Sequence, residues 1–438
     1  MVKDRARFGI EGAVVLDSRG EPRRANIYAE GGTITAVTEE RIEADRVLQR
    51  DGAVVIPGLA NLHVHMRPGR ALGDGLPMLV WHERWADGLT LRMEEGDGYA
   101  GAMLALSECL LGGTTCVVVM TPHYLEAAQA ARDIGIRAIV APLGVDLPEA
   151  AGTGDDVAGS IQTITALGRQ LGERVRVWFG LDSTYSTSEE GLRTVAAAAR
   201  ELPLGLHTHM SEETHDARMP LGSKGLHGAY YFEDVGLLDL PEPVVLAHCN
   251  WLEPREIELL AAAPAAIVAH NPTSNMHLGT GVCPVLELLD AGVRLGLGTD
   301  GMLSNYHLDM FEVMRGAAML QRVTRTDASA LGSAKTLELA THGGGVFDDR
   351  AGFIEPGAPA DLAVLDLRGP RFAPRVDLGD DSNLLALVVW CAGAGDVTDV
   401  IVDGRVVVED RNLTTASTDA IIADVDAVFD RIRRSLTA

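Results

Sequence analysis

The fold is decided by the stretch Val54-Val55-Ile56-Pro57-Gly58-Leu59-Ala60-Asn61-Leu62-His63-Val64-His65. It is an apolar run of strand length that ends in two histidines with one residue between them. Side chains two positions apart on a strand point to the same face, so His63 and His65 can bind one ion together. Zinc and iron(II) both accept neutral imidazole as a ligand. The stretch therefore predicts a buried strand that delivers a metal-binding pair.

Three further apolar runs end in the same manner. They are Leu204-Gly205-Leu206-His207-Thr208-His209, Val244-Val245-Leu246-Ala247-His248 and Leu295-Gly296-Leu297-Gly298-Thr299-Asp300. A lone histidine at such a place is usually a packed core residue. Packing does not explain four histidines and one aspartate, all of them residue types that bind metals, at the ends of predicted strands. Histidine and carboxylate ligands with an open coordination position are typical of a catalytic metal site rather than a structural one.

Strands and helices alternate through the middle of the chain. We expect strands near 59–65, 114–120, 137–143, 175–181, 204–209, 243–249, 265–271 and 294–300, with helices at 99–111, 124–134, 189–201, 254–262 and 284–291. Eight strands separated by helices favour an α/β fold of the (β/α)8 TIM barrel type over an open sheet. In such a barrel the carboxyl ends of the strands face the active site.

The two ends of the chain show a different pattern. About the first 55 residues alternate short β-like runs with glycine-rich turns, which predicts a small antiparallel sheet. Similar runs return at 361–366 and 397–408, and residues 418–436 predict a terminal amphipathic helix. We expect residues 1–57 and 351–438 to form one small β-sandwich domain, with the helix, beside a barrel of residues 58–350.

Composition limits the classes of partner. The chain has 438 residues, with 37 Lys+Arg against 62 Asp+Glu and a net charge of −25, which disfavours nucleic acid and anionic membranes. Its 5 cysteines show no CxxC spacing, and no apolar run reaches the roughly 18 residues of a membrane span. We expect a cytoplasmic homo-oligomer that acts on a small molecule and binds neither nucleic acid nor membrane.

Glu212 is the candidate proton carrier, because it lies three residues beyond His209 and can reach over a metal toward a substrate. The alternative is an acid placed at a helix start by the helix dipole, which fits Glu213 better. His207 lies two positions before His209, so its side chain would point to the same face of the strand as the predicted ligands. Packing alone also explains a histidine there, so His207 stays outside the predicted ligand set.

Seven ordered motifs span nearly the whole chain and resemble the amidohydrolase superfamily. The narrower resemblance is to its branch of triazine hydrolases and guanine, 8-oxoguanine and adenosine-type deaminases. The motifs are Pro57-Gly58-Leu59-Ala60-Asn61-Leu62-His63-Val64-His65, Leu110-Leu111-Gly112-Gly113-Thr114-Thr115, His207-Thr208-His209-Met210-Ser211-Glu212, Ala247-His248-Cys249-Asn250-Trp251-Leu252, residues 270–279, Gly298-Thr299-Asp300-Gly301 with Ser304-Asn305, and residues 356–362.

The resemblance implies one divalent ion, with zinc expected and iron(II) as the alternative. Its implied ligands are His63, His65, His209 and Asp300. His248 and Asp300 would orient and deprotonate the metal-bound water, and Glu212 would pass the proton to a ring nitrogen or to the leaving group. The expected substrate contacts are Trp81, Asn275 and Ser304.

One ion is expected rather than two. Two-metal hydrolases on this barrel commonly bridge their ions with a carboxylated lysine on the fourth strand. The expected fourth strand, Val175-Arg176-Val177-Trp178-Phe179-Gly180-Leu181, contains no lysine. The three lysines of the chain, Lys3, Lys224 and Lys335, end no predicted strand.

Two departures from the resembled branch bear on the substrate. Nucleoside-deaminating members usually have a Pro-x-Glu stretch whose Glu contacts ribose hydroxyls, whereas this chain has no proline between Trp81 and Thr90 and has Thr90 near the expected Glu. A histidine in a Gly-Pro-His-like turn after the fourth strand is also missing, since the chain reads Gly180-Leu181-Asp182-Ser183 there.

The main hypothesis is therefore a hydrolytic deaminase of a cyclic amidine, which breaks a non-peptide C–N bond. A metal-bound water would attack a ring carbon of an aromatic N-heterocycle and release ammonia, with a free base or triazine favoured over a nucleoside. One alternative is a hydrolase of the same family that expels chloride or an alkylamine. A second is an adenosine-type (S-adenosylhomocysteine or methylthioadenosine) deaminase, and a third is an inactive barrel that serves as a scaffold.

Overall fold

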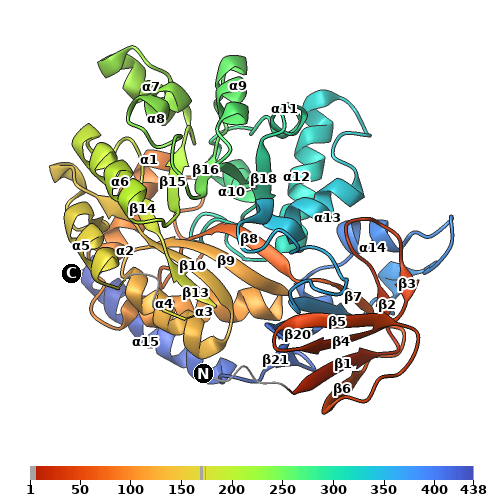
Figure 1. Cartoon of the computed structure of the whole chain (residues 1–438). Helices are drawn as coiled ribbons and strands as arrows, with labels where there is room; N and C mark the ends of the chain where they lie inside the picture. Colours follow the sequence, from red (N-terminus) through yellow and green to blue (C-terminus); the bar gives the residue numbers. More distant parts are fainter. Residues whose placement is uncertain (1–5, 168–170, 173, 438) are drawn as a thin grey trace.

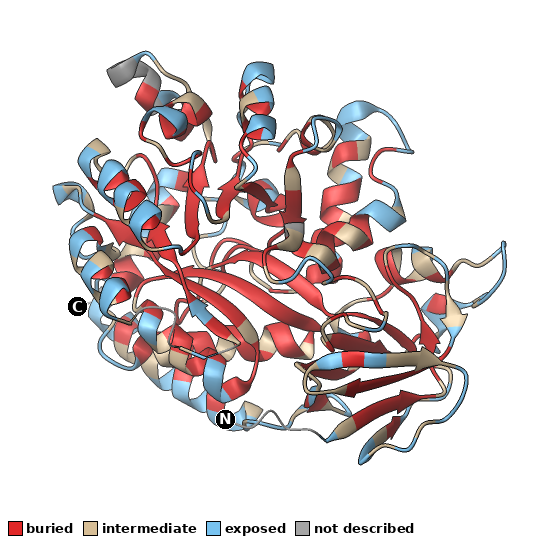
Figure 2. Ribbon diagram, viewed as in Figure 1, coloured by how far each residue is buried: buried red, intermediate tan, exposed pale blue. Residues whose placement is uncertain are grey.

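The computed structural model describes residues 6–167, 171–172 and 174–437, and parallel strands occupy the middle of that chain (Figure 1). These strands are β8 (Leu59–Val64), β9 (Thr114–Thr121), β10 (Arg137–Pro142), β13 (Val175–Val177), β14 (Phe179–Leu181), β15 (Leu206–Met210), β16 (Val244–His248), β17 (Ala266–His270) and β18 (Arg294–Leu297). Nearly every residue in them is buried, because barrel strands are covered on both faces (Figure 2). The predicted α/β barrel fold is confirmed.

The barrel strands form two hydrogen-bonded arcs rather than one continuous ring. One arc has the order β13-β10-β9-β8 and the other has the order β14-β15-β16-β17-β18. The first seam between the arcs lies at Trp178, where the expected fourth strand is interrupted between β13 and β14. The expected eighth strand ends at Leu297, three residues early. The second seam lies between β18 and β8, where the Asp300 backbone N–H donates to the His63 carbonyl oxygen at 2.9 Å.

Side chains help to hold that second seam together. The Asn61 Oδ1 accepts a hydrogen bond from the Thr299 backbone N–H at 3.1 Å, and the Asn61 Nδ2 donates to the Thr299 Oγ1 at 2.7 Å. Asn61 is fully buried, so these bonds satisfy polar groups that could not reach water. The hydrogen bonds between Asn61 and Thr299 therefore take the place of some backbone hydrogen bonds that a longer β18 would make with β8.

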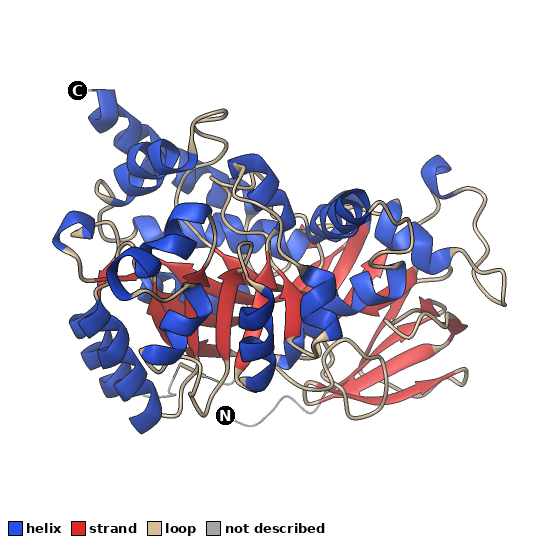
Figure 3. Cartoon of the chain, turned by 90° about the horizontal axis from the view of Figure 1, so that it is seen from above, coloured by secondary structure: helices blue, strands red, loops and turns tan. Residues whose placement is uncertain are grey.

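Helices surround the barrel strands, as the view in Figure 3 shows. They include α3 (Asp97–Leu111), α4 (Tyr124–Ile134), α5 (Val157–Leu167), α6 (Glu189–Glu201), α9 (Pro254–Ala262), α11 (Val285–Asp290), α12 (Met310–Arg325) and α13 (Ser333–His342). The spans expected for α4, α6 and α9 agree with the structure, because each apolar period is bounded by turn residues. Among the helices of the described residues, none has the length and apolar character needed to cross a bilayer.

The two chain ends form two further sheets at one side of the barrel (Figure 1). One contains β5 (Thr33–Thr38), β4 (Asn26–Glu30), β1 (Arg7–Glu11) and β6 (Arg46–Gln49), in that order. The other contains β22 (Asn412–Leu413), β21 (Arg405–Glu409), β20 (Val397–Val402), β19 (Leu362–Leu365), β7 (Val54–Pro57), β2 (Val14–Val15) and β3 (Arg23–Arg24). Apolar side chains from both ends, including Ile10, Val55 and Ile401, share one core.

The expectation of a single antiparallel N-terminal sheet was wrong in two respects. The N-terminal strands divide between both sheets, and β1 pairs with β6 in parallel. Alternation of side chains identifies a strand but carries no information on its partner, which here comes partly from the other chain end. The division of the chain at residues 57 and 351 stays a prediction.

A short helical segment follows β8 and forms a wall over the barrel mouth. It consists of α1 (Met78–Trp81), the π-helix η1 (His82–Asp87) and α2 (Gly88–Thr90). Trp81 and Leu89 pack in one cluster with Leu303 and with Ile432 of the terminal helix α15 (Thr418–Thr437). The terminal helix, expected at 418–436, therefore lies against this wall and against α3 of the barrel.

Gly58 joins β7 of the small domain to β8 of the barrel, and its site has no room for a side chain. A Cβ at this position would lie 2.1 Å from the Thr115 Oγ1 and 2.7 Å from the Thr115 Cβ. We predict that Gly58→Ala lowers the free energy of unfolding by about 1–3 kcal/mol, the usual cost of overpacking a tight core. Urea denaturation measures the change.

The matched control is Gly395→Ala, where an added Cβ meets nothing within 4 Å. That variant should stay within about 0.5 kcal/mol of the natural protein. Equal stability of the two alanine variants would contradict the steric argument, and recovery in Gly58→Ala combined with Thr115→Ser or Thr115→Ala would support it.

Candidate active site

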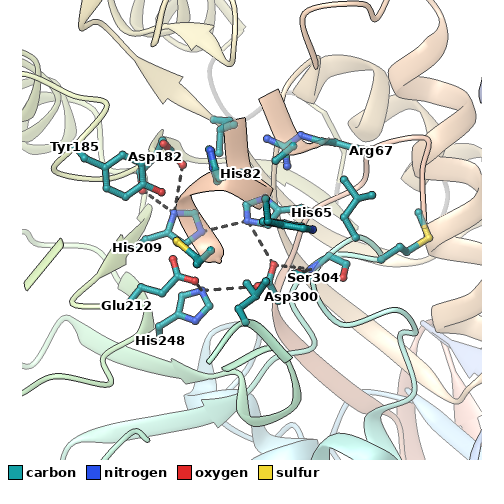
Figure 4. A pocket seen from close by; sticks show the side chains of 18 residues that line it. His65, Arg67, His82, Asp182, Tyr185, His209, Glu212, His248, Asp300 and Ser304 are labelled. Carbon is teal, nitrogen blue, oxygen red and sulfur yellow. Dashed lines mark hydrogen bonds and ion pairs between the residues drawn. The ribbon is translucent and has the colours of Figure 1, made fainter. Parts of the chain in front are cut away.

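Four imidazoles meet at the carboxyl ends of the barrel strands (Figure 4 labels three of them). His63 lies in β8 and His65 follows its last residue, while His209 lies in β15 and His248 ends β16. The ring centre of His63 lies 4.7 Å from that of His65, 4.9 Å from that of His209 and 5.3 Å from that of His248. Three strand ends predicted from separate apolar runs are thus brought to one point.

Each of these four rings has its Nδ1 engaged by a group outside the cluster. The partners of His63, His65, His209 and His248 are respectively His207 Nε2 at 3.0 Å, Met120 O at 2.6 Å, Asp182 O at 2.6 Å and Asn275 Oδ1 at 2.8 Å. The three oxygen acceptors require a proton on Nδ1, which leaves the Nε2 lone pair available. His207 therefore orients His63 from behind, a role that its parity on the strand did not distinguish from packing.

Asp300 reaches the cluster through a turn rather than a strand end. Its φ of 62° lies in the left-handed region, which few residues other than glycine adopt and which is common at functional sites. The Ser274 hydroxyl donates to Oδ2 and the Gly301 backbone N–H donates to Oδ1, both at 2.6 Å. The Oδ1 atom lies 3.7 Å from the His63 Nε2 and 3.6 Å from the His65 Nε2.

The cluster fits a divalent cation. The Nε2 atoms of His63 and His248 are buried and have no hydrogen-bond partner among the described residues, which is costly unless a ligand satisfies them. Burial lowers the pKa values of His63 and His65 well below the usual range, with a further contribution from neighbouring imidazoles, so the rings are neutral. Neutral imidazole with one carboxylate is a donor set suited to zinc or iron(II).

Glu212 lies beside His248, past the end of β15 (Figure 4). Its Oε1 is 3.7 Å from the His248 Nε2, and the side chain is buried. Burial raises the pKa of Glu212 to about 8, opposed by His209 and supported by the charge of Asp300. A carboxyl group of this kind can take and return a proton near neutral pH. Its neighbour Glu213 is not among the residues that line the pocket.

The expected substrate contacts fall in two different places. Trp81 and Ser304 line the pocket above the cluster. Asn275 instead lies behind His248, where its Oδ1 accepts from the His248 Nδ1 and its Nδ2 donates to the Asn250 Oδ1 at 2.7 Å. With both ends of its amide engaged, Asn275 is placed to orient His248 rather than to contact a substrate.

Sequence reasoning did not identify three polar residues that line the same pocket, namely Arg67, His82 and Tyr185. Arg67 is two positions past His65, and His82 is adjacent to Trp81, so proximity to known motifs was the available signal. Burial lowers the pKa of His82, but the hydrogen bond to Asp87 at 3.2 Å and the charges of Asp87 and Asp182 together outweigh it and raise that pKa. Burial raises the pKa of Tyr185 well above its usual value.

Comparison with known proteins identifies the family. The sequence model of the amidohydrolase family matches residues 54–407. The 5'-deoxyadenosine deaminase of Methanothermobacter thermautotrophicus is 34% identical over 92% of this chain and 93% of its own, and the 5-methylthioadenosine/S-adenosylhomocysteine deaminase of Desulforudis audaxviator is 33% identical over 98% and 100%. A crystal structure of an adenosine deaminase from Xanthomonas campestris with bound zinc aligns with a TM-score of 0.90 and 29% identity, covering 98% of each chain.

The chain therefore belongs to the amidohydrolase family, as its motifs predicted, and it is a hydrolase that acts on non-peptide C–N bonds. The names of these relatives support a hydrolytic deaminase. They give no support to the expectation of a free base over a nucleoside, and they agree better with the adenosine-type alternative. The free-base expectation rests on two departures from the resembled branch, the missing Pro-x-Glu near Thr90 and the missing histidine after the expected fourth strand, and neither departure excludes a sugar.

The hydrogen bond between Asn275 and His248 leads to a prediction. Asn275→Leu removes the acceptor for the His248 Nδ1–H, so the ring loses its fixed orientation, and turnover should fall about 10–100-fold, as is usual for such supporting contacts. Asn275→Asp keeps an acceptor oxygen and should retain more activity than the leucine variant. Steady-state kinetics with metal analysis measures both, and wild-type turnover in Asn275→Leu would contradict the orienting role.

Proposed function

We propose that the protein is a metal-dependent hydrolytic deaminase of adenosine-type substrates, which replaces a ring amino group by oxygen and releases ammonia. The observation that carries the proposal is the convergence of four fixed imidazoles, Asp300 and Glu212 at one point, and all of these residues except His63 line one pocket. The similarity to 5'-deoxyadenosine and 5-methylthioadenosine/S-adenosylhomocysteine deaminases supports the adenosine-type substrate.

A free aminated base is the second candidate substrate. Thr90, near the position expected for a ribose-binding Glu, is not among the pocket-lining residues, and its Oγ1 accepts a hydrogen bond from the Arg67 Nε at 2.8 Å. This arrangement provides no carboxylate for ribose hydroxyls at that position. Ammonia release by metal-loaded protein should be compared for adenosine, 5'-deoxyadenosine, methylthioadenosine, S-adenosylhomocysteine, adenine, guanine and melamine. Release from none of them would overturn the proposal.

We assign one divalent ion to His63, His65, His209 and Asp300, with zinc as the expected metal and iron(II) as the alternative. When bound, such an ion supplies Lewis acidity that allows a water molecule to ionise near neutral pH. A second ion is not assigned, because Asp182 rather than a lysine follows β14.

Glu212 and His248 would then carry out the proton transfers and orient the attacking water. Water adds across the C=N bond of the ring amidine, so its oxygen bonds to the amino-bearing carbon, and Glu212 moves one of its protons to the ring nitrogen. His248, whose free Nε2 carries a lone pair, would accept a hydrogen bond from the attacking water and, once it has taken up a proton, would stabilise the charge that develops on the oxygen. The amino group leaves as ammonia with the remaining water proton, and the ring keeps an oxo group.

Loss of the carboxyl group of Glu212 tests the proton transfer. Glu212→Gln keeps the size of the side chain but cannot accept a proton, so turnover should fall by roughly 100-fold or more while metal content stays near normal. Glu213→Gln is the matched control and should keep most activity. The opposite ranking of the two variants, measured by ammonia release, would transfer the role to Glu213.

A second pair of variants separates metal ligands from their neighbours. His63→Asn should lose metal and activity together, whereas His248→Asn should keep about one metal per chain and lose most activity, because His248 is assigned beside the ion and not to it. Metal analysis after purification, with activity measured on the same samples, checks both. Parallel loss of metal in the two variants would make His248 a ligand.

A further inference from the structure

Arg67 is a buried cation in the wall of the active-site pocket. It lies in the loop that leaves β8, two positions past His65, and only 6% of its surface is exposed. Figure 4 places it with His82 and His65 on the side of the pocket opposite Glu212 and His248. A guanidinium removed from water is costly unless hydrogen bonds or an anion compensate for the lost hydration.

The protein compensates for this cation only in part. The Arg67 Nε donates to the Thr90 Oγ1 at 2.8 Å, and Thr90 in turn donates to the Ala86 carbonyl oxygen at 2.9 Å, which holds the side chain in place. Asp87, Asp182 and Asp300 attract the guanidinium at longer range. Within the described part of the chain, none of these carboxylates forms an ion pair with Arg67, and its terminal nitrogens make no hydrogen bond.

The nearby carboxylates are engaged with other groups. Asp87 contacts His82, and the Asp182 Oδ2 accepts from the Ser186 hydroxyl at 2.6 Å. Asp300 is held by Ser274 and Gly301 and faces the imidazole cluster. The terminal N–H groups of Arg67 are therefore a fixed set of donors beside the imidazole cluster, still without acceptors among the described residues.

We infer that Arg67 selects substrates whose ring or ring substituent presents an oxygen acceptor with full or partial negative charge, either a carboxylate or a ring oxo group. A planar guanidinium donates two parallel hydrogen bonds, which match these oxygens better than they match a hydroxyl or an amine. The inference rests on the proposed function, because it concerns the pocket where the amino-bearing ring would lie, and it names a substrate class within that function.

The test compares substrates in pairs that differ by one acceptor. Isoguanine and adenine differ by a ring oxo group, and adenosine-5'-carboxylate and adenosine differ by a carboxylate, so the two pairs distinguish the two sources of the acceptor. Each pair is assayed by ammonia release with metal-loaded wild type, Arg67→Met and Arg67→Lys. Arg70→Met is the matched control, since Arg70 lies in the same loop and pairs with Glu108 but is not itself among the residues that line the pocket.

In at least one pair, wild type should prefer the acceptor-bearing member, and Arg67→Met should lower its kcat/KM about 10–100-fold, as expected for a charged hydrogen bond. The kcat/KM for the member without the acceptor should change by less than about threefold. Arg67→Lys keeps the charge but not the two parallel N–H donors, so its kcat/KM for the acceptor-bearing member should be intermediate. Arg70→Met should leave the preference unchanged, and metal content should be the same in all variants.

Equal loss on both members of each pair would overturn the inference, since it would mean that Arg67 only balances the charges of Asp87, Asp182 and Asp300. Absence of any preference in wild type would also overturn it while leaving the deaminase proposal intact. If wild type releases no ammonia from any compound, the proposed function fails. Binding of the same pairs to wild type and Arg67→Met, measured by calorimetry, then decides the role of Arg67 alone.

Discussion

The site depends on the hydrogen bonds that fix the Nδ1 atoms of its four imidazoles. Met120, Asp182 and Asn275 supply oxygen acceptors from three different parts of the barrel, and each acceptor determines both the tautomer and the rotation of one ring. With Nδ1 protonated, the Nε2 lone pairs can only point toward the pocket. The proposed metal site therefore depends on the barrel frame, and a change in one of these acceptors would alter the orientation of the imidazole that it holds.

Backbone conformation at the strand ends, as well as the strands themselves, determines how the site residues enter the pocket. His248 and Asp300 have φ values of 75° and 62°, so both leave the extended conformation at the point where they enter the pocket. Such conformations cost of order 1–3 kcal/mol each and persist only where surrounding contacts hold them. Here Asn275 holds the ring of His248, while Ser274 and Gly301 hold the carboxylate of Asp300. The carboxyl ends of the barrel strands are consequently less regular than an ideal barrel, and this irregularity directs the side chains.

Much of the site could be predicted because its residues end apolar runs of strand length. His63 and His65 were recognisable from a spacing of two, and the strand spans followed from apolar runs bounded by turns. Asn275 was assigned to the substrate, because nothing in its neighbouring residues indicates a partner that lies 27 positions earlier in the chain. The wall formed by Trp81 and Leu89 gave no clear helical period, and its packing against Ile432 depends on the distant end of the chain. Contacts between distant segments were thus the part that local patterns could not supply.

The division of the barrel into two arcs has a consequence for its mechanics. His63 and His65 belong to the arc that ends with β8, whereas His209, His248 and Asp300 belong to the arc that ends with β18. An ion held by His63 and His65 on one side and by His209 and Asp300 on the other would link the two arcs across a seam where the described hydrogen bonds include one backbone bond and those of the Asn61 amide. By mass action, any ligand that binds only the folded barrel adds to its stability in proportion to the logarithm of its free concentration. Resistance of the barrel to unfolding would then vary with the supply of metal, so that the same ion serves the chemistry and the cohesion of the two halves.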